Sequence, residues 1–159
     1  MNMRIGHGYD AHRFCLGKPL RIGGVTIPCD RGLEAHSDGD VLLHALIDAL
    51  LGAAGEADIG TLFPDNDPLY AEIDSRCLLR EAMKRLTAKE LAIEYVDMTI
   101  IAQMPKMAPY IEAMRREIAA CTNTHVERIN IKATTEERMG FTGRKEGIRA
   151  HAVCLLQEK

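Results

Sequence analysis

The feature that most constrains the fold of this sequence is the pair Asp10 and His12, together with a distant histidine, His44. If residues 3–12 form a strand, successive side chains alternate between its faces, so Asp10 and His12 leave the backbone on the same side. A carboxylate oxygen and an imidazole nitrogen at this spacing can bind one divalent ion. A third ligand must come from elsewhere in the chain, and His44 is the natural candidate. A fold that uses all three has to bring the segment around His44 against this strand.

The number and type of these ligands indicate a catalytic rather than a structural metal site. Three protein ligands with one open position are typical of catalytic zinc, whereas structural zinc is usually closed by four ligands, often cysteines. The five cysteines are widely spaced and include no Cys-x-x-Cys pair, so they predict neither a cysteine zinc site nor a disulfide framework. Taken alone, however, Asp-x-His is more often a surface or capping pair, and the metal hypothesis depends on the rest of the sequence.

Size and composition predict a single domain spanning residues 1–159. Apolar residues make up 47% of the chain and charged residues 27%, which is ordinary for a soluble globular protein. The net charge of −3 and the lack of a basic cluster argue against nucleic acid or a membrane surface as a partner. No apolar run approaches the roughly 20 residues of a spanning helix, and the start of the sequence has no signal-peptide pattern. Together with the cysteines, these features predict a cytoplasmic protein.

The order of the predicted elements favours an α+β fold. Strands are expected at residues 3–10, 93–102, 129–134 and 148–156, a hairpin at 20–27 turning on Gly23-Gly24, and helices at about 41–52, 75–86 and 106–121. Ser37 or Asp38 is expected to cap the first helix, and Asp74 or Ser75 the second. Residues 55–72 are expected to form a long irregular loop, which in a compact domain is usually functional or mobile. Because strands and helices do not strictly alternate, we expect a mixed β-sheet with helices packed on one face plus a small β-hairpin.

The start of the first predicted helix carries the residues nearest to His44. A helix N-terminus presents free N–H groups and a positive dipole end, so Ser37 could hold phosphate or simply cap the helix. His36 precedes the cap and is expected to be exposed and close to His44. Asp40 and Asp48 lie one turn on either side of His44, where either could orient its imidazole, although capping explains Asp40 equally well.

Carboxylates in the long loop form a second group of candidates. Asp58, Asp65 and Asp67 could accept hydrogen bonds from a polyol or help to hold a second cation. The same residues would be unremarkable in turns, so the loop alone does not decide between these interpretations. The chain contains no P-loop motif and no Gly-x-Ser-x-Gly elbow, which excludes the enzyme classes built on them.

Two segments that leave predicted strands form a third group. The hydroxyls of Thr134 and Thr135 could bind phosphate oxygens, and Glu137 could hold a hydrated Mg²⁺ that bridges phosphates. The alternative is a capped turn. The backbone of residues 102–108 could line a pocket for a flat base, although this signal is weak on its own.

Taken together, these segments form a set of ordered motifs that runs nearly end to end. The motifs are Arg4–Phe14 (RIGHGYDAHRF), Ala35–Val41 (AHSDGDV), Asp58–Gly60 (DIG), Phe63–Asp65 (FPD), Ile101–Gln103 (IAQ), Pro105–Met107 (PKM), Lys132–Thr135 (KATT) and Gly140–Arg144 (GFTGR). In order and spacing the sequence closely resembles the 2-C-methyl-D-erythritol 2,4-cyclodiphosphate synthase family, enzymes of non-mevalonate isoprenoid precursor synthesis.

The resemblance implies a phosphorus–oxygen lyase that works as a homotrimer, with each active site between neighbouring subunits. Its substrate is 4-diphosphocytidyl-2-C-methyl-D-erythritol 2-phosphate, and its products are the cyclic diphosphate and CMP. The family's Zn²⁺ ligands fall on Asp10, His12 and His44, in agreement with the spacing argument. Glu137 matches the ligand of a second cation, Mg²⁺ or Mn²⁺, on the substrate diphosphate.

The remaining site residues are also implied by the resemblance. His36 and Thr135 match positions that stabilise the transition state. Phe141 and Arg144 match ligand-contacting positions near the trimer's central cavity, where the family can bind isoprenoid diphosphates. The substrate-binding positions are Ser37, Asp58, Ile59, Gly60, Phe63, Asp65 and Asp67 for the methylerythritol end, Ala102, Pro105, Lys106, Met107 and Ala108 for the cytidine, Thr134 for the diphosphate, and Phe141 and Arg144.

One position departs from the family pattern. Many relatives carry a third threonine where this chain has Glu136, immediately before the acid that binds the second cation. Alignment to the Gly-Phe-Thr-Gly motif that follows assigns the cation to Glu137, and Glu136 is expected to point to solvent.

The implied reaction suits these residues. The 2-phosphate of the substrate attacks its own β-phosphorus and expels CMP, and a phosphate with a second pKa near 6 is already largely ionised at neutral pH, so no strong general base is needed. Positioning and cations supply the catalysis. Two other functions remain open: a zinc hydrolase that uses metal-bound hydroxide, and a non-catalytic trimer that binds isoprenoid diphosphates. Measuring CMP release with and without ring closure separates them.

Overall fold

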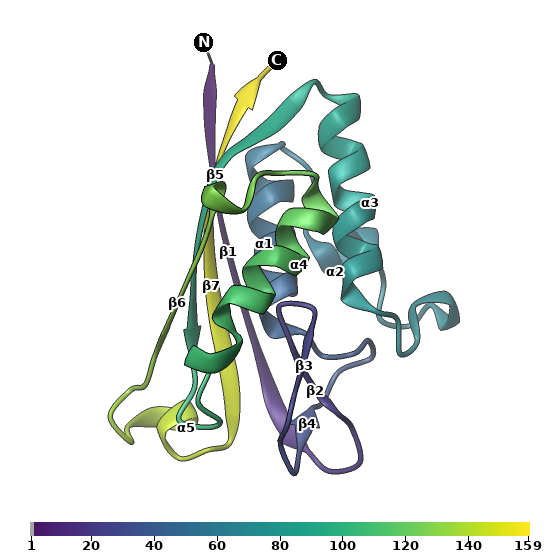
Figure 1. The fold of residues 1–159 in the computed structure, drawn as a ribbon. Coiled ribbons are helices and arrows are strands. Elements are labelled where there is room, and N and C mark those ends of the chain that lie inside the picture. Colours follow the sequence, from purple (N-terminus) through teal and green to yellow (C-terminus); the bar gives the residue numbers. More distant parts are fainter. Residues whose placement is uncertain (1) are drawn as a thin grey trace.

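The computed structural model describes residues 2–159 and contains one mixed five-stranded sheet with its long helices on one side (Figure 1). The strands of this sheet are β1 (Met3–Cys15), β4 (Gly32–Leu33), β5 (Leu91–Ile101), β6 (Ile129–Thr134) and β7 (Gly147–Glu158). Their order is β4-β1-β7-β5-β6; β5 and β6 run parallel, and the other three neighbouring pairs are antiparallel. The prediction of an α+β fold with a mixed sheet is confirmed.

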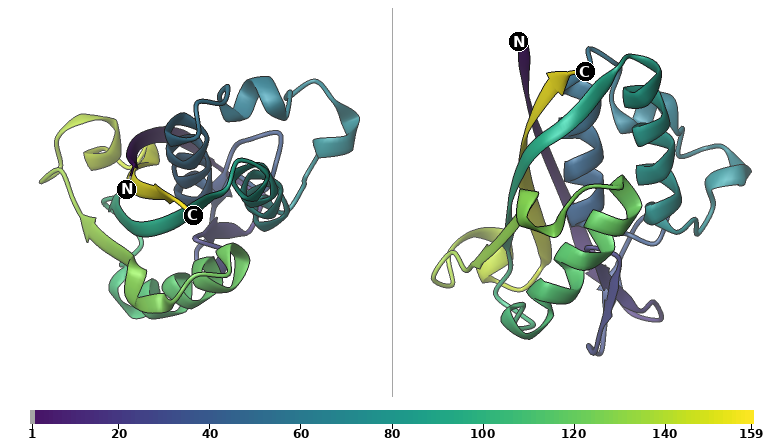
Figure 2. Two further views of the ribbon diagram at one scale, coloured as in Figure 1. Left: turned by 90° about the horizontal axis from the view of Figure 1, so that it is seen from above. Right: turned by 45° about the horizontal axis from the view of Figure 1, so that its top comes forward.

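The helices and the hairpin form a second layer. Its long helices are α1 (Val41–Ala53), α3 (Ser75–Ala88) and α4 (Ile111–Thr122), and its hairpin is β2 (Leu20–Ile22) and β3 (Val25–Ile27). Figure 2 shows the three helices side by side over the same face of the sheet. Short helical turns stand in the connections: α2 (Ile59–Leu62), α5 (Gly140–Gly143), η1 (Pro68–Tyr70), η2 (Ala108–Tyr110) and η3 (Val126–Arg128). Residues 55–72, expected to be irregular throughout, therefore contain α2 and η1.

Two glycines allow β1 to lie directly against α1. A Cβ atom at Gly6 would come within 1.9 Å of the Ala49 carbonyl oxygen, and one at Gly8 within 1.8 Å of the Ala45 carbonyl oxygen. Only glycine permits an approach this close. Because side chains alternate along a strand, the next two even-numbered residues, Asp10 and His12, face the same helix.

Helix α1 is buried on nearly every side, since the sheet covers one face and α3 packs on another. Its N-cap is Asp40, whose side chain accepts a hydrogen bond from the Leu43 N–H, so the prediction of Ser37 or Asp38 as the cap was wrong. Helix α3 begins as predicted, with Asp74 as its cap. The hairpin also turns at Gly23-Gly24 as predicted, and both glycines have positive φ.

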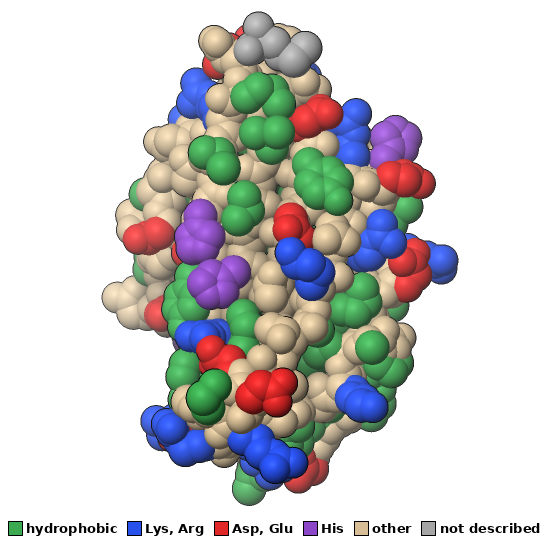
Figure 3. All heavy atoms as spheres, turned by 90° about the vertical axis from the view of Figure 1, so that its left-hand side faces the viewer, with side chains coloured by type: hydrophobic (Ala, Val, Ile, Leu, Met, Phe, Trp, Pro, Cys, Tyr) green, Lys and Arg blue, Asp and Glu red, His purple; other side chains and the backbone are tan. Residues whose placement is uncertain are grey.

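The other face of the sheet carries large apolar side chains that no helix covers. Ile5 is 74% exposed, and Met3, Tyr9, Tyr95 and Val153 are each at least 40% exposed. Strand register places these residues on one face, and Figure 3 shows hydrophobic side chains spread over that side of the molecule. None of the helices among residues 2–159 combines the length and the apolar composition that crossing a membrane would require.

Candidate active site

Asp10, His12 and His44 converge on one point between β1 and α1. The Asp10 Oδ2 atom lies 2.7 Å from His12 Nε2 and 3.0 Å from His44 Nδ1, and the two imidazole nitrogens are 3.1 Å apart. Within residues 2–159 these three form the one group of three or more side chains with the spacing of metal ligands. The tertiary fold thus brings together the three side chains that strand alternation and spacing had suggested.

The second nitrogen of His44 is held by a chain of hydrogen bonds. With Nδ1 facing Asp10 and His12, Nε2–H donates to the Ser75 hydroxyl at 2.9 Å and lies 3.2 Å from the Ser37 hydroxyl. The Ser75 hydroxyl in turn donates to Asp38 Oδ1 at 2.5 Å, and the Ser75 N–H donates to Asp38 Oδ2 at 2.9 Å. This arrangement fixes one tautomer and leaves Nδ1 free to bind a metal.

The residues that orient His44 are therefore not the two aspartates proposed from its helix. Asp40 accepts hydrogen bonds from Gly23, Gly24 and Leu43, and Asp48 accepts one from the Ile59 N–H. Both carboxylates hold backbone groups rather than the imidazole.

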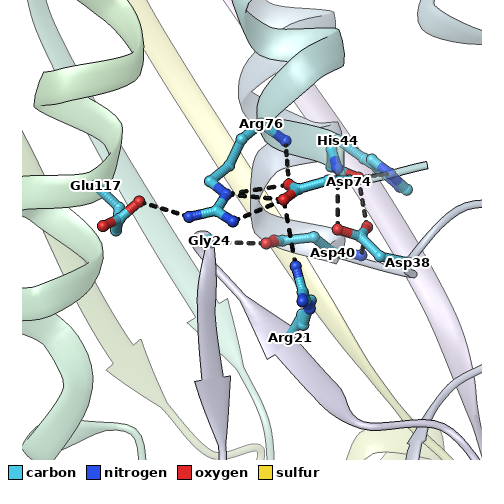
Figure 4. Close-up of polar contacts among 9 residues, drawn as sticks. Arg21, Gly24, Asp38, Asp40, His44, Asp74, Arg76 and Glu117 are labelled. Carbon is cyan, nitrogen blue, oxygen red and sulfur yellow. Dashed lines mark hydrogen bonds and ion pairs between the residues drawn. The ribbon is translucent and has the colours of Figure 1, made fainter. Parts of the chain in front are cut away.

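A network of buried and half-buried polar groups supports this arrangement (Figure 4). Asp40 joins the first turn of α1 to the hairpin through the N–H groups of Gly23 and Gly24. At the start of α3, Arg76 pairs with Asp74 at 2.7 Å and with Glu117 of α4 at 3.0 Å. Arg21 of the hairpin also pairs with Asp74 at 3.3 Å, so ion pairs connect the hairpin, α3 and α4.

Electrostatics favour an ionised Asp10. Burial alone would raise the pKa of Asp10, but its hydrogen bonds and charge interactions with His12 and His44 lower that pKa to about 2. Burial tends to lower the pKa of His44, yet the interaction with Asp10 outweighs it and raises the pKa overall. Asp40 behaves differently. Burial and the nearby charge of Asp38 raise its pKa to about 6, although hydrogen bonds from three backbone N–H groups act to lower it.

The three ligands open into a cavity of about 350 Å³. The predicted site residues that line it are Asp10, His12, His36, Ser37, His44, Ile59, Gly60, Phe63 and Asp65. Ala35, Tyr70, Ile73 and Leu78 complete the lining and were not singled out from the sequence. His36 is partly buried rather than exposed, and its Nε2 lies 3.1 Å from the Asp67 carbonyl oxygen.

Two predicted loop residues stand beside the cavity rather than in its wall. The exposed carboxylate of Asp58 caps α2 by accepting a hydrogen bond from the Thr61 N–H. The Thr61 side chain, together with this N–H, lowers the pKa of Asp58. Asp67 caps η1 through the Leu69 N–H. Both residues shape the segment that carries Ile59, Gly60 and Phe63.

The residues expected at the cytidine and diphosphate form a separate group. None of them lines the cavity of Asp10, His12 and His44 in the part of the chain described. They are Ala102, Pro105, Lys106, Met107 and Ala108 after β5, and Thr134, Thr135, Glu137, Phe141 and Arg144 at and after the end of β6. Their two loops touch each other: the Ala102 N–H donates to the Thr134 carbonyl at 3.0 Å, and the Arg138 N–H donates to Gln103 Oε1 at 3.1 Å.

Glu136 does not point to solvent, contrary to the expectation from the sequence. Its carboxylate accepts a hydrogen bond from the Thr142 hydroxyl and pairs with Arg149, whereas Glu137 is exposed. No local pattern indicated this pairing, because Arg149 lies on β7 and meets Glu136 only in the folded chain.

Ser75 and Asp38, which hold the outer nitrogen of His44, were missed as candidate site residues from the sequence. Both were considered only as helix caps, which is the usual role of these residue types before an apolar periodic segment. The signal that could have found them is the surplus of capping residues at each helix start: Asp40 caps α1 and Asp74 caps α3, which leaves Asp38 and Ser75 free to bind each other.

The donor set matches the chemistry of zinc. One carboxylate and two imidazoles, with an adjoining cavity, correspond to the three-ligand open sites in which Zn²⁺ is catalytic. The carboxylate is ionised and the outer nitrogen of His44 is hydrogen-bonded, as metal-ligating histidines usually are.

Comparisons with known proteins agree with this geometry. The YgbB family matches residues 3–157. The chain is 60% identical over 154 residues to the 2-C-methyl-D-erythritol 2,4-cyclodiphosphate synthase of Pseudomonas entomophila, covering 97% of this chain and 98% of that protein. The bifunctional IspDF of Campylobacter jejuni superimposes with a TM-score of 0.96 at 41% identity, covering 99% of this chain and 43% of that one. A CDP complex of IspF from Plasmodium falciparum gives a TM-score of 0.88 at 36% identity over 99% and 97%.

Proposed function

Since this chain belongs to the YgbB family, with 2-C-methyl-D-erythritol 2,4-cyclodiphosphate synthases among its relatives at 60% identity, we infer that it is a cyclodiphosphate synthase of isoprenoid biosynthesis. It converts 4-diphosphocytidyl-2-C-methyl-D-erythritol 2-phosphate to the 2,4-cyclodiphosphate and CMP. The observation that carries this conclusion is the group Asp10, His12 and His44, assembled at the wall of a cavity. We propose that residues 1–159 form a single domain with this activity.

We propose Zn²⁺ as the ion that Asp10, His12 and His44 hold. Bound there, it supplies Lewis-acid stabilisation of charge on a phosphate oxygen. The protein's own contribution is to keep Asp10 ionised and His44 in one tautomer. Ser75 and Asp38 do the latter through the outer nitrogen of the imidazole.

The cavity suits the methylerythritol end of the substrate. Asp65 and the Ser37 hydroxyl offer polar contacts for a polyol, while Ile59 and Phe63 offer apolar walls. His36 stands at the same wall, where it can stabilise charge that develops on a phosphate. These roles follow from the lining of the cavity and from the family resemblance.

The second group of residues suits the nucleotide. In this proposal the backbone of residues 102–108 holds cytosine, the hydroxyls of Thr134 and Thr135 contact the diphosphate, and exposed Glu137 holds Mg²⁺ or Mn²⁺ beside it. The CDP complex of the Plasmodium falciparum relative, at 36% identity, supports a cytidine nucleotide as the ligand.

The reaction is an intramolecular phosphoryl transfer. An oxygen of the substrate's 2-phosphate forms a bond to the β-phosphorus, and the bond between that phosphorus and the oxygen bridging to CMP breaks. The electron pair of the broken bond leaves with CMP as phosphate oxygen charge, so no water is consumed. The attacking phosphate is largely ionised at neutral pH, which fits a site whose groups position and neutralise charge rather than remove a proton.

We propose that three copies assemble with the uncovered sheet face at the interface. Two observations support this arrangement. The apolar residues of that face, Ile5 and Tyr9 among them, are exposed in the single chain. The proposed substrate residues also form two separate groups, so a neighbouring copy is needed to bring one group opposite the other.

Two further assignments complete the proposal. Phe141 and Arg144 contact an isoprenoid diphosphate in the central cavity of the trimer. The enzyme works in the cytoplasm, because its five cysteines are all free and such usage is typical of a reducing compartment.

The test is to incubate the purified protein with the cytidyl substrate, Zn²⁺ and Mg²⁺, and to follow the products by phosphorus NMR. We expect equal amounts of CMP and cyclic diphosphate. Release of CMP with a linear phosphate product would identify a hydrolase instead. Absence of CMP release from fully metal-loaded trimer would leave only a binding role.

A further inference from the structure

Glu136 is anchored in the fold by two side chains from different elements. Its Oε2 atom accepts a hydrogen bond from the Thr142 hydroxyl at 2.5 Å, and its Oε1 atom pairs with Nη2 of Arg149. Thr142 is fully buried in α5, and Arg149 projects from β7 with its guanidinium carbon 5.7 Å from the centre of the Phe141 ring. The β6–β7 connection is thereby fastened to the sheet at Glu136.

The backbone turns sharply directly after this anchor. Glu137 and Arg138 both have left-handed φ angles, 52° and 66°, which residues with a side chain adopt only when their surroundings hold them there. The turn leaves Glu136 directed inward and Glu137 exposed. The Glu137 N–H donates to the Thr135 hydroxyl at 3.2 Å, so the proposed diphosphate residue and the proposed cation ligand are joined in the same turn.

The anchor also reaches the proposed nucleotide loop. The N–H of Arg138, the second left-handed residue, donates to Gln103 Oε1. A change in the path of residues 136–138 would therefore displace the loop that follows β5, as well as Glu137.

We propose that Glu136, held by Thr142 and Arg149, is a positioning residue that sets Glu137 for the second divalent cation. This inference rests on the proposed function, in which Glu137 binds that cation. Arg149 has a second effect, because it neutralises the Glu136 carboxylate beside the place where an anionic diphosphate binds. Of the two adjacent acids, Glu137 is then the one presented to the cation.

The experiment compares Glu136→Ala, Glu136→Gln and Arg149→Gln with the wild-type trimer. The measurements are the Mg²⁺ concentration that gives half-maximal turnover and the calorimetric affinity for CDP at fixed Mg²⁺. We expect about a 10-fold higher Mg²⁺ requirement for Glu136→Ala, a smaller shift in the same direction for Glu136→Gln, and similarly weakened CDP binding. Zinc content and the rate at saturating Mg²⁺ should stay near wild type.

A matched control is Glu94→Gln, which removes an acid paired with Arg128 on a part of the sheet remote from this loop. It should leave both measurements unchanged. If Glu136 and Arg149 act as a pair, the double variant Glu136→Gln/Arg149→Gln shifts the Mg²⁺ requirement no further than the larger single shift.

Two outcomes would overturn the inference. One is a Glu136→Ala protein with the same Mg²⁺ requirement as Glu94→Gln. The other is a uniform fall in rate at every Mg²⁺ concentration, which would assign Glu136 to fold stability alone. CDP binding with Mg²⁺ is measured without turnover, so it tests the inference separately from the proposed reaction, whose failure would appear as absence of cyclic product from the wild type.

Discussion

The two halves of the proposed site are built in different ways. The metal half lies on regular structure: Asp10 and His12 on β1 and His44 in α1, where the His44 side chain is only 9% exposed. The nucleotide half lies on the loops after β5 and β6, and Thr134, Thr135 and Glu137 are all exposed. The three ligands of the first half come together within one chain, whereas in the proposed function the second half is completed by a cation, the substrate and a neighbouring copy.

This difference follows from how each half is held. Gly6 and Gly8 let β1 lie against α1 without intervening side chains, so the ligand geometry depends on backbone packing. The nucleotide half depends on side-chain contacts such as those of Glu136 and Gln103. We therefore expect changes in the metal half to remove activity and changes in the other half to alter its dependence on ligands.

The largest expected effect comes from His44→Ala. Loss of one of three ligands should remove tightly bound zinc and lower turnover by about 10³-fold or more, since the main stabilisation of phosphate charge goes with it. Zinc content and CMP release are measured together on the trimer, with His125→Ala as the control histidine variant. Normal cyclisation by zinc-free His44→Ala protein would disprove the ligand assignment.

Glu137→Ala should have a smaller effect of a different kind. We expect turnover at limiting Mg²⁺ to fall by about 10²-fold, because one ligand of the second cation is lost, while zinc content stays at the wild-type level. Metal analysis and a Mg²⁺ titration of the rate check both expectations. Loss of zinc from this variant would show that the two halves are not independent.

Ser75→Ala tests the hydrogen-bond chain behind His44. Removing the hydroxyl leaves Nε2–H without its 2.9 Å partner, so we expect zinc affinity to fall by about 10- to 100-fold. Competition with a chromophoric chelator measures that affinity. Added zinc should restore most of the activity, and an unchanged affinity would remove Ser75 from the site.

The smallest expected effect is that of Asp58→Ala. This exposed residue caps α2 beside the cavity, so its loss should weaken binding of the methylerythritol end by about 10-fold through the Ile59–Phe63 segment. Affinity for CDP alone should change little, because the proposed function places CDP against the nucleotide half and the zinc rather than against the α2 segment. Calorimetric titration with both ligands makes the comparison, and equal losses would count against the role given to Asp58.

The same difference between the halves explains what the sequence could predict. Strand alternation placed Asp10 and His12 on one side, and His44 was the natural candidate for a third ligand, although the metal hypothesis still depended on the rest of the sequence. The α+β class and the hairpin followed from periodicity and turn residues. For residues 102–108 and 134–137 the residue types suggested possible roles and left a capped turn open, and only the family resemblance assigned those roles, since loop conformation has no periodic signal.

The predictions that failed depended on tertiary partners. Asp40 rather than Ser37 or Asp38 caps α1, because the helix begins only at Val41, and Asp38 binds Ser75 of α3 instead. Glu136 turned inward because Arg149, thirteen residues later on β7, meets its carboxylate. Such pairings between distant segments arise only when the chain folds, and local propensities do not specify them.

Zinc X-ray absorption spectroscopy can show whether three protein ligands hold zinc with an open position for the substrate diphosphate. Spectra are recorded on the zinc-loaded trimer before and after addition of CDP and Mg²⁺. We expect a four-coordinate zinc with nitrogen and oxygen ligands, and a phosphorus neighbour that appears with CDP. A zinc held by four protein ligands and unaffected by CDP would rule out this site.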